Sequence, residues 1–277
     1  MNYDVKTRIE KLVASAADIS DPLERSRKYK TIVSLISQEA ARSNDLQDIE
    51  EAKKIAGLVT DDPSKAYLEI VRAIAKFSRK NIKIFDEAVK ITGKINNDLD
   101  LSVGLSEIIT AFAKYGITKK DDVIYSDSLD LIEKIPLNTY RAMAYRNISY
   151  SLTGIDRGRS LELLDKSIDI LGKSSGIKTD YLVKAFCETG SILALLDDER
   201  SRGFIKQAIE ISGDLVDDFD KSAALLKIVE TEMEIGIKSN DQELITEASI
   251  ISKGITKEYY KTLAEYVMIE KNVSETT

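Results

Sequence analysis

The chain of 277 residues carries a net charge of −7, with 40 basic residues, 47 acidic residues and no histidine. It therefore lacks the commonest general base, the Ser-His-Asp triad and imidazole metal ligands. Its single cysteine, Cys187, excludes an intrachain disulfide framework and a thiolate zinc site. With three prolines and thirteen glycines, breaks are few, and the composition predicts an almost entirely helical chain.

The clearest helical unit covers residues 84–115. Apolar residues follow a 3.6-residue period from Ile84 to Ile95, and the period restarts at Val103. The polar segment 96–98 separates the two halves and predicts a turn. A helix pair this short cannot bury both apolar faces alone, so the unit needs neighbours of the same kind.

The same unit recurs along the whole chain. Each first helix has a central residue, and successive central residues are 36 to 41 positions apart: Leu12, Ala52, Ala88, Ser128, Ser167, Ala208 and Ala248. Each second helix has its own small residue: Ser26, Ala66, Ser102, Ala142, Ala185, Ser222 and Thr262. These two columns of anchor residues predict seven repeats, at 2–43, 44–80, 81–117, 118–154, 155–196, 197–238 and 239–271.

Polar turns mark the repeats in chain order. In repeats one and two, Pro22 and Pro63 follow polar cap residues, which is a common helix start. Repeats three and four turn at 96–98 and 136–139, and repeat six turns at 217–218. The fold class expected is all-α, an α-α superhelix (solenoid) of about seven antiparallel helix pairs. It would form a single domain over residues 1–271, followed by a disordered tail at 272–277.

Repeat five departs from the pattern. Four extra residues lengthen its turn between Gly172 and Gly176, and Ser174 replaces the apolar residue that ends the other first helices. This insertion predicts a longer exposed loop, a break in superhelical regularity and weaker packing across repeats four to six.

Charge and targeting signals constrain the partners and the compartment. The segment 197–243 carries the whole net charge of −7, and the remaining residues balance. A nucleic-acid binder needs a basic stripe, so neither nucleic acid nor an anionic membrane is an expected partner. No signal peptide, lipidation motif or long apolar span is present, which favours a cytoplasmic protein.

The chemistry expected is non-catalytic. No phosphate-binding glycine loop occurs, and carboxylate pairs such as Asp61/Asp62 lie in predicted turns, where they are typical of helix caps. No cofactor is expected. A polar strip along the first helices is then the best candidate binding surface: Lys54, Lys90, Lys94, Asp130, Lys134, Asp169, Lys173 and Glu210. The alternative is a solvated face with local ion pairs such as Glu87/Lys90.

The unit resembles the tetratricopeptide-like repeats of prokaryotic proteins. The residues that carry this resemblance are Ala52, Ile55, Asp62-Pro63, Lys65-Ala66 and Ile74-Ala75. The resemblance implies a right-handed superhelix that binds protein segments. The function expected is a scaffold or adaptor that binds a protein or peptide in its groove.

A second hypothesis is a sensor that binds a small molecule or a signalling peptide. Its best residues are Tyr140, Arg141 and Arg146 together with Tyr145. Tyr145 is also expected in the core, because its column contains Tyr29 and other large apolar residues. A deep pocket that holds two or more of these side chains would favour the sensor.

Overall fold

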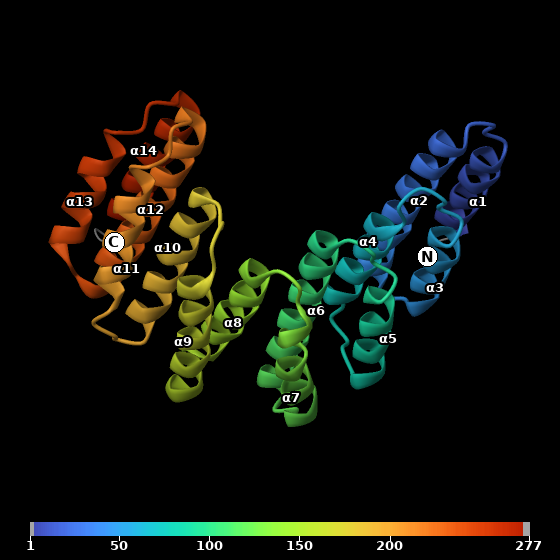
Figure 1. Ribbon diagram of the computed structural model, residues 1–277, viewed down its shortest axis with the longest axis horizontal. Coiled ribbons are helices and arrows are strands. Elements are labelled where there is room, and N and C mark those ends of the chain that lie inside the picture. The colour runs from blue at the N-terminus through green and yellow to red at the C-terminus, as the bar shows by residue number, and fades with distance from the viewer. Residues whose placement is uncertain (1–2, 274–277) are drawn as a thin grey trace. The chain divides into compact units, whose positions relative to one another are not determined.

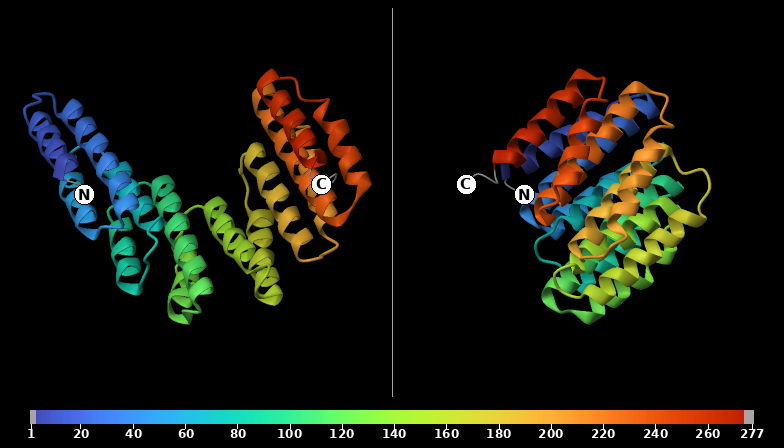
Figure 2. Two further views of the ribbon diagram at one scale, coloured as in Figure 1. Left: turned by 180° about the vertical axis from the view of Figure 1, so that it is seen from behind. Right: turned by 90° about the vertical axis from the view of Figure 1, so that its left-hand side faces the viewer.

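The structure is a computed structural model that describes residues 3–273, with side chains at residues 6–270. Over this range the chain forms fourteen α-helices, one 3-10 helix and no strand (Figures 1 and 2), which confirms the all-α prediction. The helices are α1 (Tyr3–Ala17), α2 (Pro22–Ser43), α3 (Leu46–Ala56), α4 (Ser64–Ala75), α5 (Ile82–Thr92), α6 (Asp98–Lys119), α7 (Asp122–Asp130), η1 (Ile132–Lys134), α8 (Asn138–Leu152), α9 (Arg157–Lys173), α10 (Thr179–Leu195), α11 (Ser201–Ser212), α12 (Asp218–Ser239), α13 (Gln242–Ser252) and α14 (Glu258–Val273).

The chain divides into two compact units, residues 1–151 and 152–277. The division falls at the end of α8, in the fourth predicted repeat. Each unit is built from helix pairs in the predicted order, and each has its own core. The continuous array of seven repeats stays a prediction.

Side-chain caps explain where most helices begin. A helix leaves its first backbone amides without partners, and a short polar side chain before the helix accepts hydrogen bonds from them. The N-cap residues that do so are Asp21, Asp45, Asn81, Asn97, Asp121, Asp156, Asp217 and Asp241. The polar turns found in the sequence therefore start helices directly.

Within each unit, the second helices form the closely packed layer. In residues 1–151, α2 packs on α4 and α4 packs on α6, and each second helix also contacts the next first helix. The first helices α1, α3, α5 and α7 are spaced too widely for comparable packing (Figure 1). In residues 152–277, α10, α12 and α14 pack in succession in the same way. Open spaces between helices therefore occur mainly along the first-helix layer.

Both repeat columns lie in the core. The first-helix anchors from Ala52 to Ala248 are fully buried, and the second-helix anchors from Ser26 to Ser222 are at most 1% exposed. Thr262, in the last predicted repeat, is exposed. Serine anchors also bind the next repeat, because their Oγ atoms accept backbone hydrogen bonds: Thr60 to Ser26 at 3.1 Å, Leu137 to Ser102 at 3.0 Å and Lys257 to Ser222 at 3.2 Å.

The first helix of repeat four is shorter than its counterparts. α7 ends at Asp130, and a single 3-10 turn, η1, leads to Ile135. Pro136 explains why the helical conformation does not continue past η1, because the residue before a proline is disfavoured in the α region. Ile135 is indeed extended, with φ −70° and ψ 118°.

The insertion in repeat five forms the expected exposed loop. α9 ends at Lys173, and Gly176 adopts a φ of +75°, a left-handed conformation that favours glycine. Repeats five and six nevertheless share a buried cluster, and the weaker packing expected across repeats four to six stays a prediction. Leu164, Ile192 and Leu196 form this cluster, against which Phe204 of α11 packs. They share it because the insertion lengthens only the α9–α10 loop, whereas the repeats meet along the helix bodies.

Limited proteolysis of the native protein is expected to cut first between Gly172 and Thr179. Ser175, Gly176 and Lys178 are exposed and lie outside any helix, so this backbone can enter a protease site without unfolding a helix. A time course with trypsin, which can cleave after Lys173 and Lys178, checks this by mass spectrometry. Protection equal to that of the shorter turns would contradict it.

The C-terminal end differs slightly from the expectation. The last helix continues to Val273, beyond the predicted end at Lys271, because the sequence between them contains no helix breaker. Residues 274–277 of the predicted tail lie outside the described residues.

No helix between residues 3 and 273 combines the length and the apolar character that crossing a membrane requires.

Candidate functional site

The best candidate site is a groove between the first helices α5 and α7 in the unit of residues 1–151. It encloses about 460 Å³ and collects three residues of the predicted strip: Lys90, Asp130 and Lys134. The other lining residues are Phe85, Asp86, Val89, Asp127 and Leu131. The wide spacing of the first helices leaves this groove open. We call it the α5–α7 groove.

The rim of the α5–α7 groove carries charges that form no salt bridge with another described residue. Lys90 and Lys134 are exposed, as are the three aspartates that line the groove. None of the five forms a salt bridge within 4 Å among the residues that the structure describes, whereas many other charged residues do. An unpaired exposed charge stays available for a charged group of a ligand.

The floor of the α5–α7 groove is apolar and rigid. Phe85 is 1% exposed, and its ring stacks on Phe112 of α6 with centroids 4.7 Å apart. Val89 and Leu131 are half-buried beside it. Stacked aromatic rings in a close-packed core hold such a floor in place. The groove can therefore accept an apolar side chain between groups of both charges.

Lys54 lies in a different groove. A cavity of about 590 Å³ opens between α1 and α3, and Lys54 lines it together with Glu51 and Asp48. Lys54 forms a salt bridge with Glu51 at 3.3 Å, which is the local i,i+3 pairing of a solvated face. Its charge is therefore already satisfied within α3.

An ion pair joins the neighbouring first helices α3 and α5. Lys53 of α3 forms salt bridges with Glu87 of α5 and, at 2.9 Å, with Glu50. Burial lowers the pKa of Lys53, but hydrogen bonds with Glu87 and Glu50 outweigh it and raise the pKa above its ordinary value. Glu87 therefore pairs with α3 and not with Lys90, which leaves Lys90 free for the α5–α7 groove.

The remaining residues of the predicted strip do not line the α5–α7 groove. Lys94 is exposed just beyond the end of α5. In the other unit, Asp169 and Lys173 form an i,i+4 salt bridge at 2.7 Å on α9, and Glu210 is exposed on α11. The residues of the predicted strip therefore do not form one continuous surface. Only those in the α5–α7 groove line a concave site whose charges form no salt bridge with another described residue.

The tyrosine and arginine cluster of α8 makes internal contacts. Arg141 donates to the carbonyl oxygen of Ile135 at 2.9 Å and forms a salt bridge with Glu133 at 3.4 Å. The hydroxyl of Tyr145 donates to Glu133 at 2.9 Å, and burial, followed by this carboxylate, raises the pKa of Tyr145 to about 12. Tyr145 is 7% exposed and Arg146 is 1% exposed, whereas Tyr140 is half-buried.

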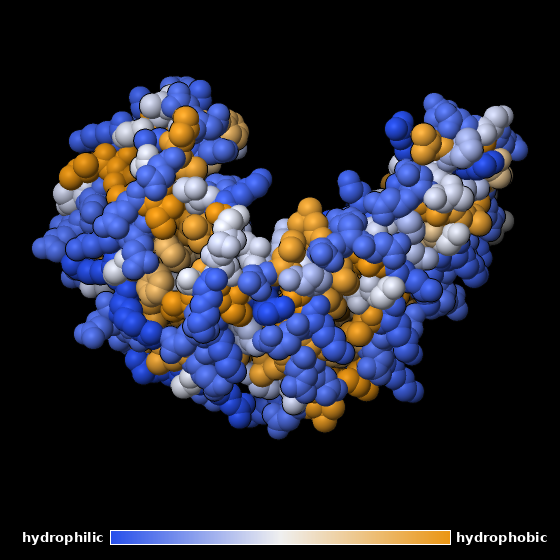
Figure 3. All heavy atoms as spheres, viewed as in Figure 1, coloured by the Kyte–Doolittle hydropathy of each residue, from blue (hydrophilic) through white to orange (hydrophobic). Residues whose placement is uncertain are grey.

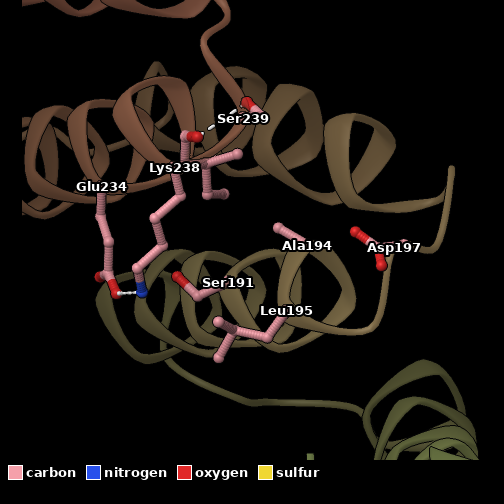
Figure 4. A pocket seen from close by; sticks show the side chains of 8 residues that line it. Ser191, Ala194, Leu195, Asp197, Glu234, Lys238 and Ser239 are labelled. Carbon is pink, nitrogen blue, oxygen red and sulfur yellow. Dashed lines mark hydrogen bonds and ion pairs between the residues drawn. The ribbon is translucent and has the colours of Figure 1, made fainter.

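A cavity between second helices was missed by reasoning on the first helices alone. In the unit of residues 152–277, α10 and α12 enclose about 230 Å³ (Figure 4). Its lining includes Ser191, Ala194 and Leu195 of α10, which face Lys238 of α12. Lys238 pairs with Glu234 at 2.8 Å. The small residues Ser191 and Ala194 are the signal in the sequence, because short side chains leave space between packed helices.

Cys187 is a core residue. It is fully buried in α10, and burial raises the pKa of its thiol to about 12. A thiol protonated at neutral pH is a poor nucleophile. Among residues 6–270, no group of three or more cysteine, aspartate or glutamate side chains is arranged to hold a metal ion.

The face of the molecule drawn in Figure 3 is mostly polar. On the face in Figure 3, hydrophilic side chains dominate and are interrupted by separate apolar areas. Scattered apolar residues are normal on soluble surfaces, so concavity and unpaired charge distinguish the α5–α7 groove more than apolar area does.

Comparison with known proteins identifies no family. No protein-family model matches the chain, and no curated protein matches it. Among solved structures, the crystal structure of Ton1535 from Thermococcus onnurineus NA1 is similar over 95% of this chain and 84% of that one. The sequence identity is 11% and the TM-score is 0.35, a level that carries no argument about fold or function. The tetratricopeptide-like resemblance stays a prediction.

Proposed function

We propose that this protein is a non-catalytic interaction scaffold, a solenoid of helix pairs that binds a segment of a partner protein in the α5–α7 groove. The observation that carries the proposal is the unpaired rim of Lys90, Lys134 and three aspartates over a floor of Phe85, Val89 and Leu131. Protein interfaces combine such an apolar centre with a polar rim.

The groove also indicates the chemistry of the bound segment. Its two lysines and three aspartates give the rim a mixed charge, so a segment of one sign only would meet repulsion. A partner segment should place an apolar side chain on the Phe85 floor and flank it with residues of both signs. An isolated small ion would leave the apolar floor uncovered.

Reversing one charge of the rim is expected to weaken partner binding by at least about tenfold, or about 1.4 kcal/mol. Lys90→Glu and Asp130→Lys test the two signs separately, since each places a like charge opposite a group of the partner. Partners retained from native extract at 0.3 M salt would be identified by mass spectrometry, and their affinities then measured by titration.

Lys94→Glu is the matched control. Lys94 lies on the predicted strip and is exposed, yet it does not line the groove. The proposal expects wild-type affinity from this variant. Equal losses from Lys94→Glu and Lys90→Glu would assign binding to the strip in general and would contradict the groove.

A further inference from the structure

Glu232 of α12 is a carboxylate inside the core of the unit of residues 152–277. The residue is 0% exposed, and neither carboxylate oxygen has a hydrogen-bond partner in the described chain. The equivalent positions in repeats one and three, ten residues after the second-helix anchor, hold Ile36 and Phe112, which are fully buried. A polar group left unsatisfied in such a position is costly and rare, so it points to a ligand.

Glu232 lines a cavity. In repeat three, the rings of Phe112 and Phe85 stack on each other. In repeat six, the counterparts of these two rings are Glu232 and Ile205, and a cavity of about 190 Å³ lies there. Its other lining residues are Arg202 and Lys206 of α11, and Glu243, Leu244 and Glu247 of α13. Glu232 is therefore a buried, unpartnered carboxylate on the wall of a cavity.

The cations nearby do not neutralise Glu232. Arg202 pairs with Asp241 and, at 3.2 Å, with Glu243. Lys206, which like Arg202 lies on α11, is exposed and forms no salt bridge within 4 Å among the described residues. Glu247 adds a second negative charge, and burial, followed by Glu247, raises the pKa of Glu232 to about 8. This pKa favours a protonated Glu232 at neutral pH.

We propose that this cavity binds a primary alkylammonium group, with Glu232 and Glu247 accepting from the ammonium and Ile205 and Leu244 contacting the alkyl chain. An ammonium group has three donors, which matches two carboxylates that lack donors. A cavity of about 190 Å³ is much larger than one water molecule needs and has room for a small amine, such as one with four carbons. The lysine side chain and a free alkylamine both carry a primary ammonium on an alkyl chain. The cavity belongs to the unit of residues 152–277, whereas the α5–α7 groove belongs to the unit of residues 1–151.

The groups that face Glu232 set the expected pH dependence. They are Arg202 and Lys206 of α11, Glu243 and Glu247 of α13, and Cys187 of α10, whose thiol is protonated at neutral pH. An ammonium binds the ionised carboxylate, so binding should displace the proton of Glu232. Because the pKa is about 8, the ionised fraction and hence the affinity should rise about 50-fold between pH 6 and pH 8.

The carboxyl ¹³C resonance of Glu232, assigned with Glu232→Gln, reports this directly in the whole protein. Addition of n-butylammonium chloride is expected to lower the titration midpoint of Glu232 by at least about one pH unit. n-Butanol, which has the alkyl chain without the charge, and sodium chloride at equal ionic strength should leave the midpoint unchanged. A midpoint that butylammonium does not move would overturn the proposal.

Variants and a second ligand separate the remaining outcomes. Calorimetric binding of butylammonium should disappear in Glu232→Gln and persist in Glu230→Gln, which removes the same charge from the same helix outside the cavity. A peptide with one internal lysine distinguishes the sources: binding of both ligands assigns a protein lysine, and binding of the amine alone assigns a free alkylamine. Retained binding in Glu232→Gln would contradict the site.

Discussion

Replacing Phe112 with alanine is expected to lower the free energy of unfolding by about 3–5 kcal/mol. Phe112 is 0% exposed, and its ring stacks on Phe85 at 4.7 Å, so truncation removes a large buried surface and leaves a cavity beneath the α5–α7 groove. Chemical denaturation followed by circular dichroism measures the loss. The groove should lose its floor at the same time, so partner binding should fall with stability.

Val216→Ala is the control for this prediction. Val216 is 96% exposed, so its truncation should change the free energy of unfolding by no more than about 0.5 kcal/mol. A loss below about 1 kcal/mol for Phe112→Ala would show that the ring is not part of a close-packed core.

Replacing Gly116 with alanine is expected to destabilise the protein by about 1–3 kcal/mol. A Cβ atom at Gly116 would lie 2.8 Å from the amide nitrogen of Tyr125 and 2.9 Å from the carbonyl oxygen of Asp121. Both are backbone atoms of the next first helix and its cap, so α6 and α7 would have to separate. The same close approach recurs in repeat six, where a Cβ at Gly236 would lie 3.1 Å from the carbonyl oxygen of Asp241.

Gly203→Ala provides the matched comparison. Gly203 also lies inside a helix, but nothing stands within 4 Å of the added Cβ atom. Alanine favours the helix, so this variant should gain about 0.5–1 kcal/mol. Opposite signs for Gly116→Ala and Gly203→Ala in urea denaturation would establish close backbone approach as the reason for Gly116. Equal gains in both variants would contradict it.

Periodicity predicted most of the local architecture. Apolar spacing and small-residue columns located the helix pairs, because a short amphipathic helix can bury its face only against a neighbour. Ala88 and Ser102 illustrate this, since both columns are buried as expected. The insertion at Ser174–Gly176 was also found, because glycine and serine runs interrupt helices.

Contacts between residues that are far apart in the sequence were harder to predict from the sequence. The strip that contains Lys54, Lys90 and Lys173 seemed uniform, yet only Lys90 of these three lines a groove with unpaired charges. Whether a lysine of the strip keeps an unpaired charge in a groove depends on ion pairs within its helix and on the spacing of the first helices. Neither can be read from a column of polar residues. Arg146 shows the same limit, because its charge suggested a binding role and the structure buries it.

The burial of Glu232 could not be predicted from its column. At this position repeats one and three hold the buried Ile36 and Phe112, but repeat two holds Lys76, which is exposed. The burial of the Glu232 side chain depends on contacts between helices that the repeat pattern does not contain.

Site-specific photocrosslinking tests the central claim most directly. A photoreactive residue in place of Val89, on the floor of the α5–α7 groove, should crosslink to one partner protein in cell extract. The same residue in place of Leu35, which is 46% exposed on second helix α2 of the same unit, should not. Crosslinks to a single protein from position 89 alone are the predicted result. Crosslinks from position 35 alone, or equally from both positions, would contradict a partner bound in the α5–α7 groove.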